Sequence, residues 1–482
     1  MIPVSLGWIA QQTQGQLLAN QQLSDDSQQD SGSVNVTGVS TDTRSISKGD
    51  IFIALVGPNF NGHDYLNVAL QKGAIAAIVS QKTNIKLPTI MVSDTRIALG
   101  LFAKAIRNKV NPKTIGITGS SGKTTVKEMV NAILSQRGKV LATQGNFNND
   151  IGVPLTLLRL QTDHEYAVIE MGANHQGEIE YTCALARPDV ATIINAAPAH
   201  IEGFGSLFGV ARAKSEIIKG LSSTGVAILN HDSQFYEFWQ GKSATEQVLT
   251  FSYDSQKGDF HAANVSINPE GCAEFELITP IGSVAVRLRV PGVHNVGNAV
   301  VSAALAISAG ANLADVKAGL FAMQSVSGRL TVKVVSSQIK VLDDTYNANV
   351  GSVKAAIDLL ATFTGFKVFV FGDMGELGDQ AAMYHQQIGE YAKQHNIDAL
   401  ISSGPLSAHA SSAMQNQGMS CSDATEAFNA LVKLIAPLTK NAMGEPITIL
   451  VKGSRSARME QVVNALSAFD FGPSNLQEPE QC

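Results

Sequence analysis

The sequence predicts an α/β protein of three domains, and three observations support this prediction. The chain of 482 residues is long enough for roughly three domains of ordinary size. An apolar strand, a glycine-rich turn and an amphipathic helix follow one another near residue 120, which predicts a central P-loop-type mononucleotide-binding domain. Beyond residue 325, apolar strands alternate with helical segments, which predicts a C-terminal Rossmann-like domain. We place the domains at residues 1–94, 95–325 and 326–482, with a disordered tail from about residue 472.

The first domain is predicted to be a small α/β unit. Four short β-branched runs read as strands: Val34–Val39, Ile51–Val56, Ala76–Val79 and Thr89–Val92. A helix is expected at residues 65–72, among these strands. The stretch from Gln21 to Ser33 is rich in Gln, Ser and Asp and is interpreted as a surface loop.

The glycine-rich turn predicts a site for nucleotide phosphates. Its residues are Gly119, Ser120, Ser121, Gly122, Lys123, Thr124 and Thr125. Backbone N–H groups at such a strand-to-helix turn converge on an anion, and the helix dipole favours its charge. The lysine can reach the β- and γ-phosphates, and the first threonine can hold Mg²⁺. The strict motif has a glycine at the position of Ile117, so the match is imperfect.

Three further residues of the central domain are candidates from their positions. Glu170 ends an apolar strand, where an acid commonly contacts the magnesium of a bound nucleotide, although an N-cap or a solvated strand end would look the same. His200 follows another strand, and a lone histidine is more often structural than a ligand. Lys214 lies in a helical segment, and its pattern alone indicates only a solvated helix face.

Polar clusters at the ends of later elements are further candidates. Asn295 and Asn298 precede the predicted helix Ala299–Ala309, and asparagine can pair with an adenine edge or simply cap a helix. Asp344, in a run of carboxylates and amides after a strand, suggests a ribose or metal-water contact. The turn from Lys452 to Arg455 suits a phosphate or carboxylate, or is an ordinary surface turn.

Composition limits the possible partners and the compartment. The net charge of −6 gives no basic footprint for nucleic acid or for an anionic membrane. No stretch of about 18 apolar residues predicts a transmembrane helix, so no stable membrane insertion is expected. The N-terminus lacks a basic region before its apolar residues, and the four cysteines have no metal or redox spacing. We therefore expect a cytoplasmic protein, with a monomer as the default.

Taken together, these motifs resemble the Mur ligases, the ATP-dependent amide-forming enzymes of peptidoglycan synthesis. The resemblance spans nearly the whole chain and rests on five segments: Ser40–Arg44, Thr118–Thr125, Gly145–Pro154, His200–Ser206 and Asp344–Asn349. It implies that the first domain binds UDP, the second binds ATP and metal, and the third brings the amino-acid substrate. The family usually has a proline where this chain has Val350, a departure that removes no functional group.

The resemblance also implies a role for individual residues. The implied catalytic residues are Lys123, Lys214, His200 and Arg329. Thr124, Glu170 and His200 would surround magnesium, and a carbamylated Lys214 would bridge to a second ion. Loop residues 119–125, Asn295, Asn298, Arg329 and Asp344 would contact ATP. The substrate-binding residues would be Ser40, Thr43, Arg44, Asn146, Asn149 and Arg455, the last being a guess for the acceptor.

The implied reaction joins D-alanyl-D-alanine to UDP-N-acetylmuramoyl-tripeptide through an acyl phosphate, with ATP and Mg²⁺. A sibling ligase, either the one that adds the third residue or a folylpolyglutamate synthetase, is one alternative. The Asn-Phe-Asn-Asn run at residues 146–149 argues against the former, and the UDP-type N-terminal block against the latter. A nucleotide-dependent switch without ligation is the alternative from another class. The sequence leaves open whether the third residue of the tripeptide is meso-diaminopimelate or lysine.

Overall fold

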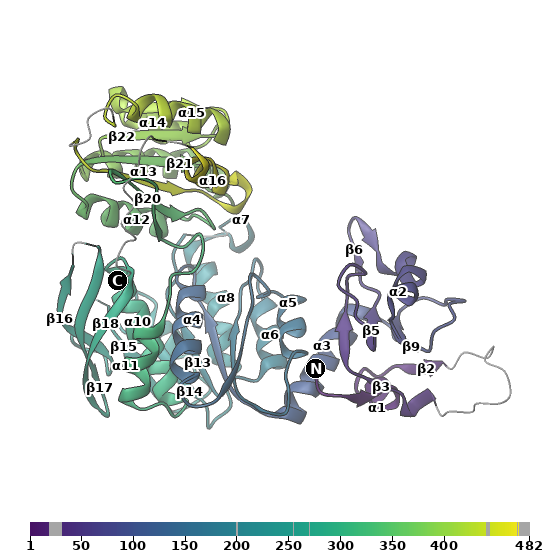
Figure 1. Cartoon of the computed structure of the whole chain (residues 1–482). Coiled ribbons are helices and arrows are strands. Elements are labelled where there is room, and N and C mark those ends of the chain that lie inside the picture. Colours follow the sequence, from purple (N-terminus) through teal and green to yellow (C-terminus); the bar gives the residue numbers. More distant parts are fainter. Residues whose placement is uncertain are drawn as a thin grey trace.

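The computed structural model describes residues 1–18, 31–198, 201–253, 255–268, 270–439, 444–469 and 471. Within these residues the strands build large sheets of five, six and six strands, one for each of three successive parts of the chain. Figure 1 shows the third part stacked above the second, while the first lies to one side of it. The fold is therefore the three-part α/β architecture that the sequence predicts.

The first part contains the five-stranded sheet, in the order β2-β9-β8-β5-β4. Its strands are β2 (Gln16–Leu18), β4 (Gly38–Ser40), β5 (Asp50–Ile53), β8 (Ala76–Val79) and β9 (Thr89–Met91). The flanking elements are α1 (Leu6–Gln12), α2 (Leu66–Lys72), the pair β1 (Val4–Ser5) and β3 (Asn35–Val36), and the hairpin β6 (Val56–Gly57) and β7 (Phe60–Asn61). The predicted strand at residues 34–39 is two strands, because β3 pairs with β1 whereas β4 pairs with β5 in another sheet. Residues 21–30 of the predicted loop lie outside the described part.

The second part is built on a parallel sheet in the order β11-β12-β10-β13-β14-β15. These strands are β10 (Lys113–Thr118), β11 (Lys139–Ala142), β12 (His164–Glu170), β13 (Val190–Ile193), β14 (Val226–Asn230) and β15 (Val248–Phe251). Three antiparallel strands follow: β16 (His261–Ile267), β17 (Cys272–Thr279) and β18 (Gly282–Pro291).

Helices cover both faces of this parallel sheet. They are α3 (Thr95–Val110), α4 (Lys123–Leu134), α5 (Gly152–Leu157), α6 (Glu178–Ala186), α7 (Ile201–Phe204), α8 (Leu207–Lys219), α9 (Tyr236–Gln240), α10 (His294–Ser308) and α11 (Leu313–Ala322). One core cluster contains buried residues of β10, α4, α10 and the antiparallel strands. Helix α4, which follows the glycine-rich turn, therefore packs against β10, β11 and β12 and beside α10.

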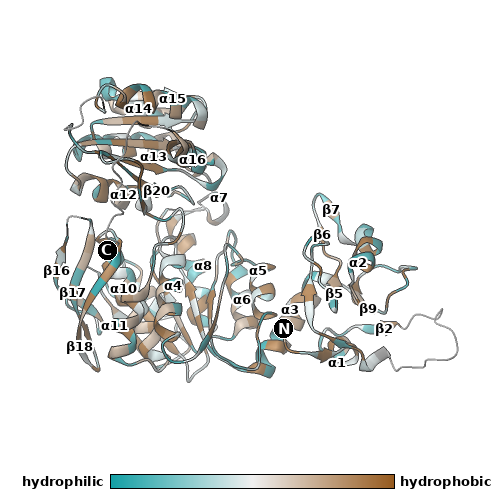
Figure 2. Cartoon of the chain, viewed as in Figure 1, coloured by the Kyte–Doolittle hydropathy of each residue, from teal (hydrophilic) through white to brown (hydrophobic). Residues whose placement is uncertain are grey.

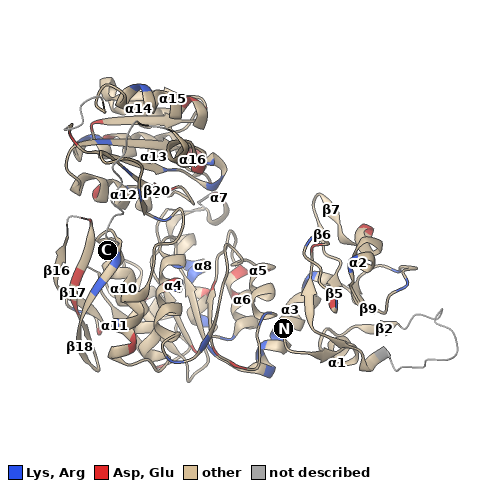
Figure 3. Cartoon of the chain, viewed as in Figure 1, with Lys and Arg blue, Asp and Glu red and all other residues tan. Residues whose placement is uncertain are grey.

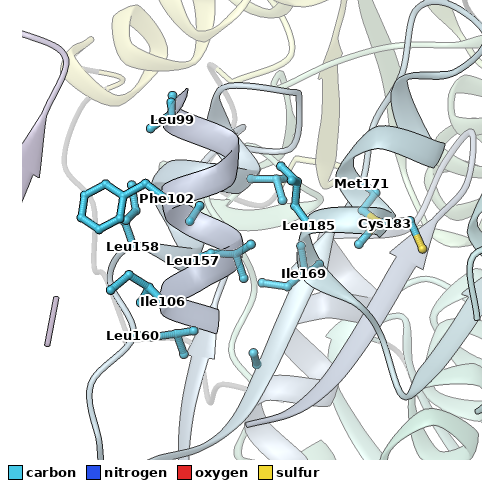
Figure 4. Close-up of a cluster of buried hydrophobic side chains, with 14 of the residues drawn as sticks. Leu99, Phe102, Ile106, Leu157, Leu158, Leu160, Ile169, Met171, Cys183 and Leu185 are labelled. Carbon is cyan, nitrogen blue, oxygen red and sulfur yellow. The ribbon is translucent and has the colours of Figure 1, made fainter. Parts of the chain in front are cut away.

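Helix α3 joins the first part to the second through a shared core. Its Asp94 N-cap accepts hydrogen bonds from the N–H groups of Arg96 and Ile97. Leu99, Phe102 and Ile106 recur on one helix face and are buried in a cluster that also holds residues of both neighbouring parts. Figure 4 shows Phe102 and Ile106 beside Leu158 and Leu160, which follow α5.

The third part has a sheet in the order β19-β20-β24-β21-β22-β23, parallel except at the edge strand β19. Its strands are β19 (Thr331–Val334), β20 (Ile339–Asp344), β21 (Phe366–Gly372), β22 (Ala399–Ser403), β23 (Gly418–Cys421) and β24 (Ile447–Lys452). The helices are α12 (Val350–Thr362), α13 (Ala381–Gln394), α14 (Ala408–Ala413), α15 (Ala424–Ile435) and α16 (Glu460–Ala468). A separate hydrophobic cluster lies on each face of this sheet.

The distribution of side chains agrees with this layering. Figure 2 shows hydrophobic residues concentrated in the sheet of the third part, as expected for strands covered on both faces. Figure 3 shows Lys and Arg interspersed with Asp and Glu over all three parts. Among the described helices, none is both long enough and apolar enough to cross a bilayer.

Candidate active site

The predicted phosphate loop connects β10 to α4 at the carboxyl edge of the central sheet. Gly122 caps the helix with a φ of +80°, a left-handed conformation that favours glycine. A Cβ at this position would lie 2.8 Å from Oδ1 of Asn298 on α10, so the glycine also permits a close approach between the two elements. The amide side chain that was assigned to the adenine region thus lies directly against the phosphate loop.

The backbone of the loop is held by an asparagine that the sequence reasoning did not single out. Asn195 follows β13, and its Oδ1 accepts hydrogen bonds of 3.0 Å from the N–H groups of both Ser120 and Ser121. Lys123 folds back over the loop and donates to the carbonyl of Gly119 at 2.8 Å. Asn195 directly follows a strand, and this position could have identified it from the sequence, because polar residues at strand ends approach ligands in this fold.

Glu170 lies against Thr124 in the first turn of α4. Thr124 donates to its Oε2 at 3.0 Å, and Asn148 donates to its Oε1 at 2.8 Å. The backbone N–H of Glu170 donates to Oγ1 of Thr143, whose carbonyl accepts from the buried Lys127. Hard oxygen donors, a carboxylate and a hydroxyl, therefore converge here, and this donor set fits Mg²⁺.

Lys123 is electrostatically coupled to Glu170, Arg329 and Lys214. Burial lowers the pKa of Lys123, an effect opposed by Glu170 and reinforced by Arg329. Burial and then the charge of Lys123 lower the pKa of Lys214 well below its ordinary value. Lys214 lies on α8 and is only 4% exposed, so the predicted solvated helix face does not describe it. The structure thus brings Lys123, Lys214, Glu170 and Arg329 into one electrostatic neighbourhood.

His200, the remaining predicted metal ligand, lies outside the described residues. Among those that are described, no three His, Cys, Asp or Glu side chains gather as a metal site. The predicted magnesium ligands do not form a cluster of that kind, because they are one carboxylate (Glu170), one hydroxyl (Thr124), His200 and a carbamylated Lys214.

Asn295 and Asn298 lie in the first turn of α10 and are both buried. Helix α10 begins at His294, earlier than predicted, and neither asparagine is its N-cap, which is Val293. Asn295 donates to the carbonyl of Pro291 at 2.7 Å and accepts from Asn298 at 2.9 Å. The Nδ1 atom of the neighbouring His294 is buried and has no hydrogen-bond partner.

The third part contributes its residues from the carboxyl ends of β20 and β24. Lys452 is buried and donates to Asp344, so it is not part of a surface turn. Arg329 lies with its guanidinium 4.3 Å from the centre of the Tyr346 ring. Asn349 caps α12 and donates at 3.3 Å to the carbonyl of Ser120, which links the third part to the phosphate loop.

The predicted substrate-binding residues lie elsewhere. Ser40, Thr43 and Arg44 are in the first part, where Arg44 pairs with Asp42 and holds the pKa of that carboxyl at about 2. Asn149 accepts a 2.8 Å hydrogen bond from the N–H of Gly152 and so orders the start of α5. The roles of these residues in substrate binding remain predictions. The remaining two predicted residues are both exposed: Asn146 lies in the loop before α5, and Arg455 pairs with Glu460 at 3.2 Å.

Comparison with known proteins gives consistent matches. Three family models match the chain: "Mur ligase family, catalytic domain" at residues 35–121, "Mur ligase middle domain" at 117–306, and "Mur ligase, glutamate ligase domain" at 328–455. The UDP-N-acetylmuramoyl-tripeptide–D-alanyl-D-alanine ligase of Escherichia coli (strain K12) is 48% identical over 434 residues, which covers 90% of this chain and 94% of the relative.

Two solved structures are similar over most of their length. A crystal structure of MurF from Acinetobacter baumannii has a TM-score of 0.89 and 36% identity, covering 97% of this chain and 99% of the other. The structure of MurF ligase from Thermotoga maritima in complex with ADP has a TM-score of 0.76 and 28% identity, covering 89% of this chain and 96% of the other.

Proposed function

The chain belongs to the Mur ligase family, and from this premise we propose that it joins D-alanyl-D-alanine to UDP-N-acetylmuramoyl-tripeptide. The proposal is carried by the 48% identity to the Escherichia coli ligase across 94% of that enzyme. The product is the UDP-linked pentapeptide precursor of peptidoglycan, and ATP is converted to ADP and phosphate. The phosphate loop between β10 and α4 provides the ATP site that such a reaction needs.

The chemistry must overcome the low reactivity of a carboxylate toward an amine at neutral pH. The terminal carboxylate oxygen of the tripeptide attacks the γ-phosphorus of ATP, the bond to the β-bridging oxygen breaks, and ADP leaves. The amine of the dipeptide then attacks the acyl phosphate, loses a proton and expels inorganic phosphate, which forms the amide. Both steps place anions close together, so cations fixed in a water-poor site lower the barrier.

Lys123 and Arg329 are the protein cations that we assign to this task. Lys123 is half-buried at the loop, and the charge of Arg329 lowers the pKa of Lys123, which supports placing both cations at one polyphosphate. The hydrogen bond from Lys123 to Gly119 holds the ammonium in the loop, where it can turn to the β- and γ-phosphates. Because Arg329 is packed on the Tyr346 ring, its guanidinium is held on the side of the third domain.

We assign Mg²⁺ to Thr124 and Glu170, with His200 as the further ligand that the family resemblance implies. Their oxygens lie 3.0 Å apart, and Asn148 and Thr143 orient the carboxylate. The metal would neutralise phosphate charge when it is bound. Thr143 and Asn148 would keep Glu170 aimed at this position.

Lys214 is assigned as a carbamylated lysine that serves a second ion. A neutral amine attacks CO₂ to give a carbamate, whose two oxygens suit Mg²⁺ better than an ammonium does. Burial lowers the pKa of Lys214 well below its ordinary value and so favours the neutral amine that this reaction needs. The lowered pKa of Lys214 therefore supports carbamylation, a role that the sequence pattern of its helix does not indicate.

The other substrates are assigned to regions that surround this centre. Asn295 and Asn298 would contact adenine, since both are buried beside the phosphate loop. Asp344 would contact the ribose. Ser40, Thr43 and Arg44 would bind the UDP group on the first domain, and the third domain would bring the dipeptide. The soluble UDP-linked substrate favours a cytoplasmic enzyme, and we propose that it acts as a monomer.

Mass spectrometry of the reaction products tests the assignment. The purified protein should add the mass of D-alanyl-D-alanine, less one water, to UDP-N-acetylmuramoyl-tripeptide, and it should ignore meso-diaminopimelate and lysine with the dipeptide precursor. Addition of a single amino acid to the shorter precursor would identify a sibling ligase. ATP hydrolysis without any amide product would support the nucleotide-dependent switch.

A further inference from the structure

A buried histidine of the third domain holds a loop that the mechanism above does not use. His385 lies on α13 with no exposed surface. Its Nε2 accepts a 2.9 Å hydrogen bond from the N–H of Met374, and its Nδ1 donates at 2.7 Å to the carbonyl of Ala381. A backbone N–H can only donate, so the proton of the neutral ring is on Nδ1, and both nitrogens are satisfied.

Met374 belongs to the loop that follows β21, and this loop is tied to two others. The carbonyl of Asp373 accepts from the N–H of Ser454 at 2.9 Å and from its hydroxyl at 2.6 Å. The carboxylate of Asp373 accepts from the N–H of Ser407 at 2.7 Å. The loops after β21, β22 and β24 are therefore joined through one residue, which is adjacent to the residue that His385 holds.

These three loops border a pocket of about 300 Å³ at the carboxyl ends of the strands. Gly404 in the second loop has a φ of +117°, and a Cβ there would lie 2.6 Å from Oδ1 of Asp373, so glycine is needed for the close approach. The pocket wall includes Asp373, Ser456 and Arg458. In open α/β sheets, ligands bind at this edge.

The chemistry of the pocket wall suits a small zwitterion. Two carboxylates (Asp373 and Asp423), the guanidinium of Arg458 and serine hydroxyls line the pocket together, and a short unprotected peptide carries one ammonium and one carboxylate. The UDP-linked tripeptide and ATP are both polyanions, so an acid in the pocket would repel them. Among the three substrates of the proposed reaction, the dipeptide is the one whose charges match the pocket.

We propose that His385 is a positioning residue for the acceptor dipeptide: it fixes the loop at Met374, and thereby holds Asp373 in the wall of the dipeptide pocket. This inference rests on the proposed function, because it takes D-alanyl-D-alanine as the acceptor. Burial lowers the pKa of His385, which keeps the ring neutral and Nε2 available as an acceptor at neutral pH.

Two substitutions at His385 separate its two hydrogen bonds. In His385→Asn the side-chain amide can replace Nδ1 and donate to Ala381, but nothing accepts from Met374. In His385→Gln the longer side chain can place its carbonyl near the position of Nε2 and accept from Met374. Because a buried N–H left without an acceptor carries a free-energy penalty, we expect His385→Asn to raise the KM for the dipeptide about tenfold. The KM values for ATP and the UDP-linked tripeptide should stay unchanged, and His385→Gln should restore most of the dipeptide KM.

Ser454→Ala provides an independent variant if His385→Asn does not fold. It removes the hydroxyl bond to Asp373 and leaves the backbone bond, so a smaller rise in the same KM is expected. If all three KM values rise together, or if Asn and Gln at position 385 behave alike and Ser454→Ala changes nothing, His385 only supports α13 and the inference is overturned. A wild-type enzyme that does not ligate the dipeptide overturns the proposed function instead, and this inference with it.

Discussion

The ammonium of Lys452 donates a 2.5 Å hydrogen bond to the carboxylate of Asp344, its register partner on the neighbouring strand. Lys452 is 1% exposed and Asp344 9%, and the lysine also donates to the carbonyl of Asn347 at 2.9 Å. The pair joins the carboxyl ends of β24 and β20, where the third domain approaches the nucleotide site. The ion pair with Lys452 holds the carboxylate of Asp344, which we assign to the ribose, in place before ATP binds.

Replacing Lys452 by Met should destabilise the third domain and weaken ATP binding. The substitution keeps most of the side-chain volume but leaves Asp344 as an unpaired buried charge, which typically costs about 3 kcal/mol or more. Urea unfolding monitored for the third domain, together with the KM for ATP, measures both effects. Lys433→Met, at an exposed position on α15, is the matched control. Equal unfolding midpoints for the two variants would contradict the account of this pair.

Replacing Lys214 by Ala should abolish ligation, because the carbamate that we propose for the second metal ion cannot form. Short carboxylates added to the buffer should restore part of the activity by supplying the missing oxygens. Lys219→Ala on the same helix is the control, since Lys219 is exposed and pairs only with Glu180 at the surface. Full activity of the Lys214 variant would remove this lysine from the metal site.

The stability of the protein should also depend on pH through Lys214. Burial, and then the charge of Lys123, lower its folded-state pKa well below the ordinary 10.5. Between these two pKa values the unfolded chain binds a proton that the folded chain does not, so the stability contribution rises with pH and is lost as pH falls. In CO₂-free buffer, the Tm of the wild type minus that of Lys214→Met should therefore increase from about pH 7 to pH 9. A difference that stays constant over this range would argue against a neutral lysine.

Replacing Glu170 by Gln should raise the Mg²⁺ concentration needed for half-maximal activity about tenfold or more, because a neutral amide is a poorer ligand for a hard cation. The kcat at saturating metal should fall as well, since phosphate charge is less well neutralised. Activity titrated with MgCl₂ at fixed ATP measures the change. Glu165→Gln, at an exposed position on the same strand, should titrate like the wild type. Identical titrations for both variants would exclude Glu170 as a ligand.

Local signals were sufficient to predict much of the fold. The phosphate loop and α4 follow from a glycine-rich turn and an apolar spacing that depend only on neighbouring residues. The parallel strands β20, β21, β22 and β24 were recognised because buried strands are continuous apolar runs. The short elements α1 and β23 were missed, because α1 ends in two glutamines and β23 contains a glycine and a serine, so neither forms a clear apolar run.

Site residues could be predicted from the sequence only where they belong to a recognisable motif. Lys123, Thr124 and Glu170 lie in or beside recognisable strand ends, and the structure brings them together. The strand end before Asn195 marks that residue as a candidate, but its partners, the N–H groups of Ser120 and Ser121, are 75 and 74 residues away and carry no local signal. The partner of His385, the N–H of Met374, is likewise fixed only by the fold. The environment of Lys214 was likewise invisible, since burial on α8 is decided by tertiary packing.

Phosphate release from ATP in the presence of UDP-N-acetylmuramoyl-tripeptide, with and without D-alanyl-D-alanine, tests the central claim most directly. The account predicts that sustained release requires both substrates and that one phosphate appears for each pentapeptide formed. Release that continues without the dipeptide, or that a single amino acid supports equally well, would contradict the assignment of this chain as the dipeptide-adding ligase.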